Sequence, residues 1–144
     1  MSVTAGLCAV SSTVGRQYHF IYDLKNMTEA QSYCREHYTD LATIDNMEMS
    51  DFHHVCYHLN FDWSSWRRSW IGLYDDMDSW KWSLSDGGFY KHGKFRHWSP
   101  REPNNHKGAE LCTEMYDNGL WNDNSCEEPL KAVCFDVRGE NINE

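Results

Sequence analysis

The chain has 144 residues, and its 22 acidic and 13 basic side chains give a formal net charge of −9. This length indicates one domain with room for a buried core, and the acidic balance argues against nucleic acid or an anionic membrane as a partner. The mean hydropathy of −0.75 and the lack of a long apolar run exclude a transmembrane helix, so no membrane insertion is expected.

The first predicted elements are a strand and a helix. Residues 1–16 are small and polar and are expected to form a loose N-terminal segment. The aromatic and β-branched run over residues 18–22 predicts a strand. Thr28 followed by Gln31 resembles a capping box. The apolar spacing after it predicts a helical stripe made of Ala30, Tyr33, Cys34, His37 and Leu41.

A second helix is expected after a short apolar link at residues 41–44. Asp45 or Asn46 would cap this helix. Its apolar side chains recur about one turn apart, at Met49, Phe52, Cys56 and Leu59. Residues 64–69 are interpreted as a surface loop.

Short strands replace the helical signal from Trp70 onward. Runs with strand composition alternate with turn residues, and the candidates are residues 70–73, 81–83, 111–115, 120–122 and 131–135. Two helices followed by a half made of strands and loops predict an α+β fold. Residues 17–137 would form the domain, and residues 138–144 a C-terminal tail.

The six cysteines favour an oxidising compartment over a cytosolic metal site. No two of them show C-x-x-C spacing, which argues against zinc. Their number alone allows 15 pairings. No apolar leader follows Met1, so we interpret the chain as a mature or excised domain. Its secreted, extracellular character is therefore inferred from the cysteines.

Oxygen-bearing side chains gather in two short segments late in the chain. The candidate metal ligands are three carboxylates and two amides, namely Glu102, Asn104, Glu110, Asn122 and Asp123. A set without imidazole or thiolate suits a hard cation, calcium before zinc. Calcium takes about six to eight oxygens, so a shell that these side chains leave incomplete can accept water or a substrate.

Three motifs in order carry a resemblance to a known family. Glu-Pro-Asn at residues 102–104, then Glu110, then Trp-Asn-Asp at residues 121–123, resembles the sugar site of C-type lectins. Trp-Ile-Gly-Leu at residues 70–73 looks like the core tetrapeptide of that family. Its four disulfide cysteines are matched by Cys34, Cys112, Cys126 and Cys134.

This resemblance implies a C-type lectin-like fold. Its parts would be two helices, two small antiparallel sheets and a long irregular calcium-binding loop region. It also implies the disulfides Cys34–Cys134 and Cys112–Cys126. In the chain-entropy model, Cys34–Cys134 closes the longer loop and would add about 4.7 kcal/mol to the free energy of unfolding, and Cys112–Cys126 would add about 3 kcal/mol.

The function implied by the resemblance is calcium-dependent binding of mannose-type sugars, namely mannose, fucose and N-acetylglucosamine. The setting would be recognition of glycans or microbial surfaces, as in innate immunity. One calcium ion would coordinate two vicinal hydroxyls, and the ligands of both ion and sugar would be Glu102, Asn104, Glu110, Asn122 and Asp123. The peptide bond before Pro103 would be cis. Single sites of this kind bind weakly, which leaves oligomerisation open.

Two features depart from the family pattern. Asn105 stands where some relatives carry an acid for a second calcium, and Asp75, Asp76 and Asp78 are alternative ligands, so an auxiliary ion stays open. Cys8 and Cys56 are left without assigned partners. They bond to each other, which we favour slightly, or stay free, or link chains.

An enzyme is the first rival interpretation, and we expect none. His54 and His58 have the spacing of zinc ligands on a helix, but Val55 stands where a His-Glu-x-x-His motif needs glutamate. Glu102 and Glu110 could imitate a glycosidase pair, but ion binding explains them better.

The second rival is a calcium-braced module of the same fold that binds a protein or ice, because a fold does not fix a function. A contact patch for such a partner would contain Trp63, Trp66 and Trp70.

Overall fold

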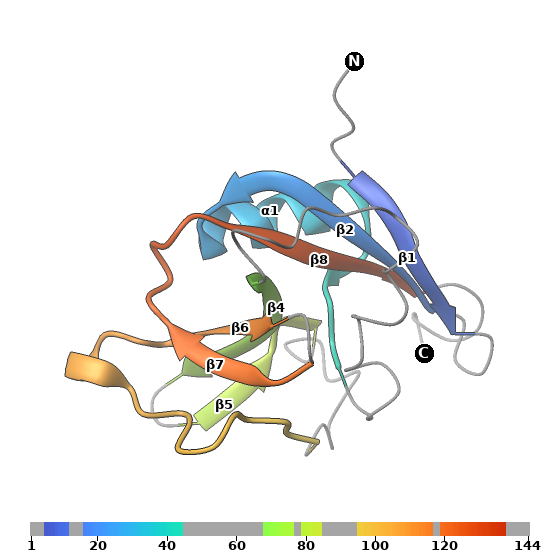
Figure 1. The fold of residues 1–144 in the computed structure, drawn as a ribbon. Helices are drawn as coiled ribbons and strands as arrows, with labels where there is room; N and C mark the ends of the chain where they lie inside the picture. The colour runs from blue at the N-terminus through green and yellow to red at the C-terminus, as the bar shows by residue number, and fades with distance from the viewer. Residues whose placement is uncertain are drawn as a thin grey trace.

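The computed structural model describes residues 5–11, 16–44, 68–76, 79–84, 95–116 and 119–137. Its elements are β1 (Ala5–Ser11), β2 (Arg16–Lys25), α1 (Met27–His37), β3 (Asp40–Leu41), β4 (Arg68–Asp76), β5 (Ser79–Trp82), a 3-10 turn (His106–Gly108), β6 (Cys112–Tyr116), β7 (Trp121–Asn124) and β8 (Leu130–Val137) (Figure 1). The predicted second helix, Cys56, Asp78 and the tryptophans Trp63 and Trp66 lie outside the described residues. The helix in the described ranges is too short to cross a membrane.

The strands form one mixed sheet in the order β1-β2-β8-β4-β6-β7, and β3 and β5 pair with β8 and β4. Figure 1 shows α1 beside the β2–β8 group and the strands β4 to β7 below it. A short parallel contact of β4 with β8, through Ser69 with Lys131 and Trp70 with Ala132, joins the two groups. Two separate antiparallel sheets were expected. The two groups of strands are joined because β4 and β8 are both buried where they meet, and buried backbone groups need hydrogen-bond partners.

The N-terminal segment contains a strand, although the sequence predicted a loose segment there. β1 pairs antiparallel with β2 from Ala5 opposite Ile21 to Ser11 opposite Arg16, with an irregularity between Leu7 and Ala9. An edge strand is held by backbone hydrogen bonds and needs no strong side-chain pattern, so its sequence signal is weak. The domain limits at residues 17 and 137 stay a prediction.

The N-cap of helix α1 lies two residues before the predicted one, at Asn26. The Asn26 carboxamide accepts the N–H of Glu29 at 2.9 Å, and the Glu29 carboxylate accepts the N–H of Asn26 at 2.9 Å. The capping box is therefore Asn26 with Glu29, and the predicted one at Thr28 is wrong. Asparagine is among the strongest N-cap residues, and a glutamate at the third helical position completes the box. The helix ends at His37, so Leu41 belongs to β3 instead of the helical stripe.

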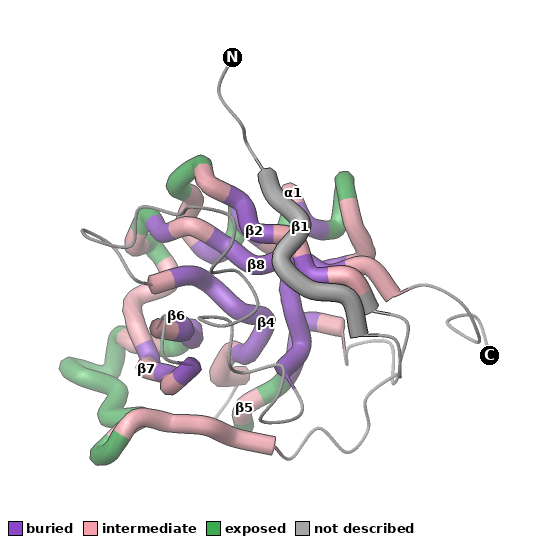
Figure 2. Tube along the Cα trace, turned by 45° about the vertical axis from the view of Figure 1, so that its right-hand side comes forward, coloured by how far each residue is buried: buried purple, intermediate pink, exposed green. Residues whose placement is uncertain are grey.

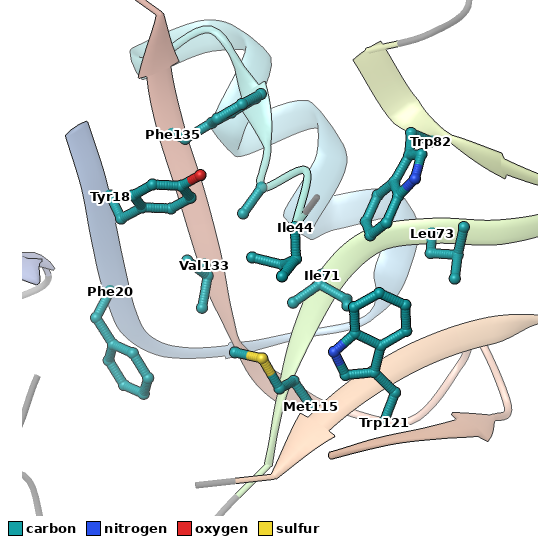
Figure 3. Close-up of a cluster of buried hydrophobic side chains, with 11 residues drawn as sticks. Tyr18, Phe20, Ile44, Ile71, Leu73, Trp82, Met115, Trp121, Val133 and Phe135 are labelled. Atoms are coloured by element: carbon teal, nitrogen blue, oxygen red, sulfur yellow. The ribbon is translucent and has the colours of Figure 1, made fainter. Parts of the chain in front are cut away.

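The core consists of two buried clusters on the faces of the sheet. Figure 3 shows the larger one, where β2 and β8 supply Tyr18 and Phe135, and where Trp82 packs edge-on against Trp121 at a centroid distance of 5.5 Å. The second cluster surrounds Trp70, whose Nε1 donates to the carbonyl of Lys25 at 2.9 Å. Burial therefore follows β2, β4 and β8, while the loop after residue 99 is exposed (Figure 2).

Gly72, in the tetrapeptide at residues 70–73, allows two backbone segments to approach closely. A Cβ at this position would lie 3.1 Å from the carbonyl oxygens of both Leu41 and Ala42. The Gly72 N–H donates to the Ala42 carbonyl at 2.9 Å. A side chain here would push β4 away from the segment after β3.

Both disulfides implied by the family resemblance are present. Cys34–Cys134 joins α1 to β8 with a Cα–Cα distance of 5.3 Å. Cys112–Cys126 joins the start of β6 to the turn after β7, at 5.2 Å. The partners of Cys8 remain a prediction, since Cys56 is not described.

Candidate functional site

The loop between β5 and β6 is fixed against β7 by the backbone of Trp121. The Trp121 N–H donates to the His97 carbonyl at 2.9 Å, and the Ser99 N–H donates to the Trp121 carbonyl at 2.8 Å. Trp121 is fully buried, so this attachment is anchored in the core. It brings the Glu-Pro-Asn motif next to the Trp-Asn-Asp motif.

Asp123 makes the direct connection between these two motifs. Its carboxylate accepts the backbone N–H of Asn104 at 3.2 Å and that of Asn105 at 2.6 Å. The side chain is 0% exposed, although it is an acid. A buried carboxylate normally needs such donors, so Asp123 also sets the position of the loop.

The loop closes on itself through its own side chains. The His106 N–H lies 2.9 Å from Glu110 Oε1 and 3.3 Å from Asn104 Oδ1. The Glu110 N–H donates to Asn105 Oδ1 at 3.0 Å. The left-handed φ of 44° at Asn105 is tolerated best by asparagine among the side chains other than glycine. These contacts hold Glu110 beside Asn104.

The peptide bond between Glu102 and Pro103 is cis, as the resemblance implies. Glu102 carries the strongest sign of unbalanced charge in the site. Its Oε2 atom is buried and has no hydrogen-bond partner in the part of the chain that the structure describes. Burial raises the pKa of Glu102, and the adjoining carboxyl of Asp123 and the charges of Glu110 and Glu114 raise it further.

This arrangement passes a chemical test for a hard cation. Several carboxylates lie close together, and an orphaned carboxylate oxygen faces them. Oxygen atoms from acids and amides are what calcium prefers. Within the described ranges, no three His, Cys, Asp or Glu side chains are close enough to hold an ion alone. The predicted ligand set adds amide oxygens from Asn104 and Asn122 to these carboxylates.

Asn122 is placed differently from the other four candidate ligands. Its Nδ2 donates to Glu114 Oε1 at 2.8 Å. Glu114 is 0% exposed and is not among the site residues predicted from the sequence. An acid inside a predicted core strand was the available signal. Asn105 was noted only as a departure, yet its backbone and side chain both support the loop.

Asp75 and Asp76 are the described members of the set suggested for an auxiliary ion, and their contacts differ. Asp76 accepts a hydrogen bond from Lys81 at 3.0 Å. The Asp75 N–H donates to the Leu111 carbonyl at 2.8 Å, and Asp75 Oδ1 is buried without a partner among the described residues. The Asn105 carboxamide oxygen is used by the Glu110 N–H. A second calcium stays a prediction.

Glu102→Gln is expected to change how stability in the presence of chelator depends on pH. A folded-state pKa above the unfolded value stabilises the fold below the unfolded pKa, and this contribution is lost as the pH rises through the folded pKa. Without calcium, the variant should therefore gain stability relative to wild type as the pH rises above the ordinary glutamate pKa of about 4.3.

Thermal unfolding in chelator across that range measures the effect. Glu127→Gln, at an exposed position outside the cluster, is the control and should track the wild type. Parallel profiles for wild type and Glu102→Gln would show that Glu102 carries no unbalanced charge.

Comparison with known proteins identifies the family of this chain. The family model described as the lectin C-type domain matches residues 23–135. Rabbit (Oryctolagus cuniculus) E-selectin is 32% identical over 128 residues, which is 82% of this chain and 21% of that protein. Human asialoglycoprotein receptor 2 is 34% identical over 126 residues, which is 83% of this chain and 37% of that protein. The chain thus spans well under half the length of these relatives.

A solved structure agrees with this match. The C-type carbohydrate-recognition domain of cow CD23 superposes with a TM-score of 0.68 at 28% identity, covering 87% of this chain and 90% of that one. The region of the family match contains α1, both disulfides and every candidate ligand. Since it extends over most of the sequence, the chain belongs to the C-type lectin domain family.

Proposed function

We propose that this chain is a calcium-dependent lectin for mannose-type sugars. The observation that carries the proposal is the orphaned Oε2 of Glu102 among the carboxylates of Asp123 and Glu110, since it leaves negative charge for a cation to balance. The proposed ligands of one calcium ion, and of the sugar on it, are Glu102, Asn104, Glu110, Asn122 and Asp123.

Each side chain has a role that follows from its hydrogen-bonding capacity. A bound calcium ion would offer open coordination positions to two vicinal sugar hydroxyls. Glu102 and Glu110 would accept hydrogen bonds from these hydroxyls, and the amides of Asn104 and Asn122 would donate hydrogen bonds to their oxygens. Asn122 has two N–H bonds on Nδ2, and one of them is used by Glu114. The other remains for the sugar.

The form of the first motif supports the mannose preference. Glu-Pro-Asn at residues 102–104 is the form that the family associates with equatorial 3- and 4-hydroxyls. The related cow CD23 domain was solved in the presence of a GlcNAc2Man3 oligosaccharide, which contains two of the sugars that we propose.

Membership of the C-type lectin family makes this chain a binding domain and not an enzyme. The glycosidase interpretation of Glu102 and Glu110 is therefore excluded. The disulfide-bonded domain is of the extracellular type. We propose that it acts as a secreted or extracellular protein in the recognition of glycans or microbial surfaces.

Calorimetric titration with calcium, followed by mannose, tests the proposal. We expect a saturable calcium site, mannose binding only in the calcium-loaded protein, and loss of both signals on chelation. Galactose is the matched control sugar and should bind more weakly. Mannose binding that survives chelator would contradict the proposal. Calcium binding without any sugar binding would favour the calcium-braced module that recognises a protein.

Glu102→Gln combined with Asn104→Asp is expected to move the preference toward galactose. The exchange keeps the number of oxygen atoms but reverses which side donates and which accepts, so the matching hydroxyl pair changes. The mannose-to-galactose affinity ratio should fall by at least about tenfold, which is about 1.4 kcal/mol.

A glycan array and competition titrations measure this ratio. Glu36→Gln is the control, because Glu36 is exposed on α1 and is distant in sequence from the proposed site. This variant should keep the wild-type ratio. If the double variant still prefers mannose while binding calcium, the proposed roles of Glu102 and Asn104 are wrong.

A further inference from the structure

Glu114 is a buried acid at the back of the proposed site. In the β6–β7 pairing it stands directly opposite Asn122, while Cys112 stands opposite Asn124. Residues that face each other across antiparallel strands lie close enough for their side chains to interact. The Glu114 side chain is 0% exposed, so it cannot touch a sugar itself.

Both Glu114 oxygens are used by donors. Oε1 accepts Asn122 Nδ2 at 2.8 Å, and Oε2 accepts Asn124 Nδ2 at 3.0 Å. An ionised carboxylate only accepts hydrogen bonds, so each amide must present its NH₂ end to Glu114. Asn122 Oδ1 therefore faces away from Glu114 and is available to an ion. The Asn124 carboxamide is used at both ends, since its Oδ1 accepts the Ser125 N–H at 2.7 Å.

Arg68 on β4 balances this buried charge. Its Nη1 lies 3.3 Å from Glu114 Oε2, and its side chain is 25% exposed. A buried carboxylate is tolerated when it is both paired and hydrogen-bonded. Because Asn124 donates to Oε2 and the Arg68 cation lies beside it, that atom must remain an acceptor in any variant that keeps these contacts.

We propose that Glu114 is a positioning residue that fixes the orientation of the Asn122 amide. It directs Asn122 Oδ1 to the calcium ion and leaves the second Nδ2 hydrogen to the sugar. This inference rests on the proposed function, because it assigns Asn122 to the ion.

Glu114→Gln is the decisive variant. Its side-chain oxygen is expected to stay at the Oε2 position, beside Arg68 and the donor Asn124, so its NH₂ group takes the place of Oε1. This NH₂ group would then face the NH₂ group of Asn122. The Asn122 amide is therefore expected to rotate by half a turn, so that its Oδ1 accepts the new N–H and no longer faces the ion. We expect calcium affinity to fall by about 10- to 100-fold, as for other residues that orient metal ligands.

The rescue variant separates positioning from damage. In the double variant Glu114→Gln with Asn122→Asp, an aspartate accepts the new N–H and still offers an oxygen to the ion. Calcium affinity should recover to within about threefold of wild type, while Asn122→Asp alone should lower it. If Glu114→Gln acted only by lowering the stability of the fold, the second substitution would not be expected to restore calcium affinity.

Asp40→Asn is the matched control. Asp40 is also a buried acid paired with an arginine, at 3.2 Å from Arg35, and it accepts from Ser83 at 2.6 Å. It lies on β3, outside the proposed site. We expect this variant to lower stability without changing calcium affinity.

Calcium titration by calorimetry, without sugar, is the readout. Wild-type affinity in Glu114→Gln, or no recovery in the double variant, would overturn the inference. Calcium binding without sugar binding in wild type would overturn the proposed sugar specificity while these affinities still test Glu114. An absence of calcium binding in wild type would overturn both.

A measurement on the wild-type protein covers the case in which Glu114→Gln does not fold. The side-chain amide protons of Asn122 should show slow hydrogen exchange for one proton, both before and after calcium is added. Fast exchange of both protons in either state would overturn the inference.

Discussion

Asp123→Asn is expected to abolish calcium-dependent sugar binding, with a fall in calcium affinity of more than about 100-fold. This exceeds the effect of residues that only orient ligands, because Asp123 would lose two roles at once. It supplies a negative charge to the proposed ion, and its two oxygens hold the N–H groups of Asn104 and Asn105. An asparagine offers only one acceptor oxygen, so one of these N–H groups loses its partner.

Calorimetric calcium titration and retention on a mannose column measure the two losses. Asp23→Asn is the control, because it makes the same change at an exposed acid on β2 that is outside every proposed ion site. We expect the control to bind calcium and mannose like wild type. Chelator-sensitive mannose binding by Asp123→Asn would remove Asp123 from the proposed ligand set.

Loss of the Cys34–Cys134 disulfide is expected to lower the free energy of unfolding by about 4–5 kcal/mol. The bond closes a loop with a sequence separation of 100 residues and joins α1 to β8. Cys112–Cys126 has a separation of 14 residues, so its loss should cost about 3 kcal/mol in the same model. Urea unfolding of the two double Cys→Ser variants in chelator gives both values.

Calcium affinity should rank these two variants in the opposite order. The shorter disulfide loop contains Asn122, Asp123 and their support Glu114, whereas Cys34 and Cys134 hold the helix to the far strand. We expect the Cys112 and Cys126 variant to lose more calcium affinity when both are measured below their unfolding transitions. If affinity followed stability instead, the shorter disulfide would have no separate role at the site.

Local sequence signals explain what could be predicted of this fold. Aromatic and β-branched runs identified the core strands, and the family motifs identified both disulfides. The helix cap was misassigned because two overlapping pairs fit the same pattern, Thr28 with Gln31 and Asn26 with Glu29. The structure has Asn26 as the N-cap, in agreement with the stronger capping preference of asparagine over threonine.

Features that depend on distant partners could not be predicted in this way. The contact between β4 and β8 is made by backbone groups at Ser69 and Trp70, which leave no side-chain pattern. The sequence places Glu114 in a predicted strand but does not reveal its partner Arg68, which lies 46 residues earlier in the chain. Its importance arises from the register of β6 with β7, and that register is a property of the folded sheet.

The attachment of residues 97–99 to Trp121 also has a consequence for self-association. β7 ends the order of the sheet, and a terminal strand with unpaired N–H and C=O groups can recruit a strand from another molecule. At Trp121 both groups are already used by His97 and Ser99. Extension of the sheet by a strand of another molecule is therefore not expected past β7 at this position.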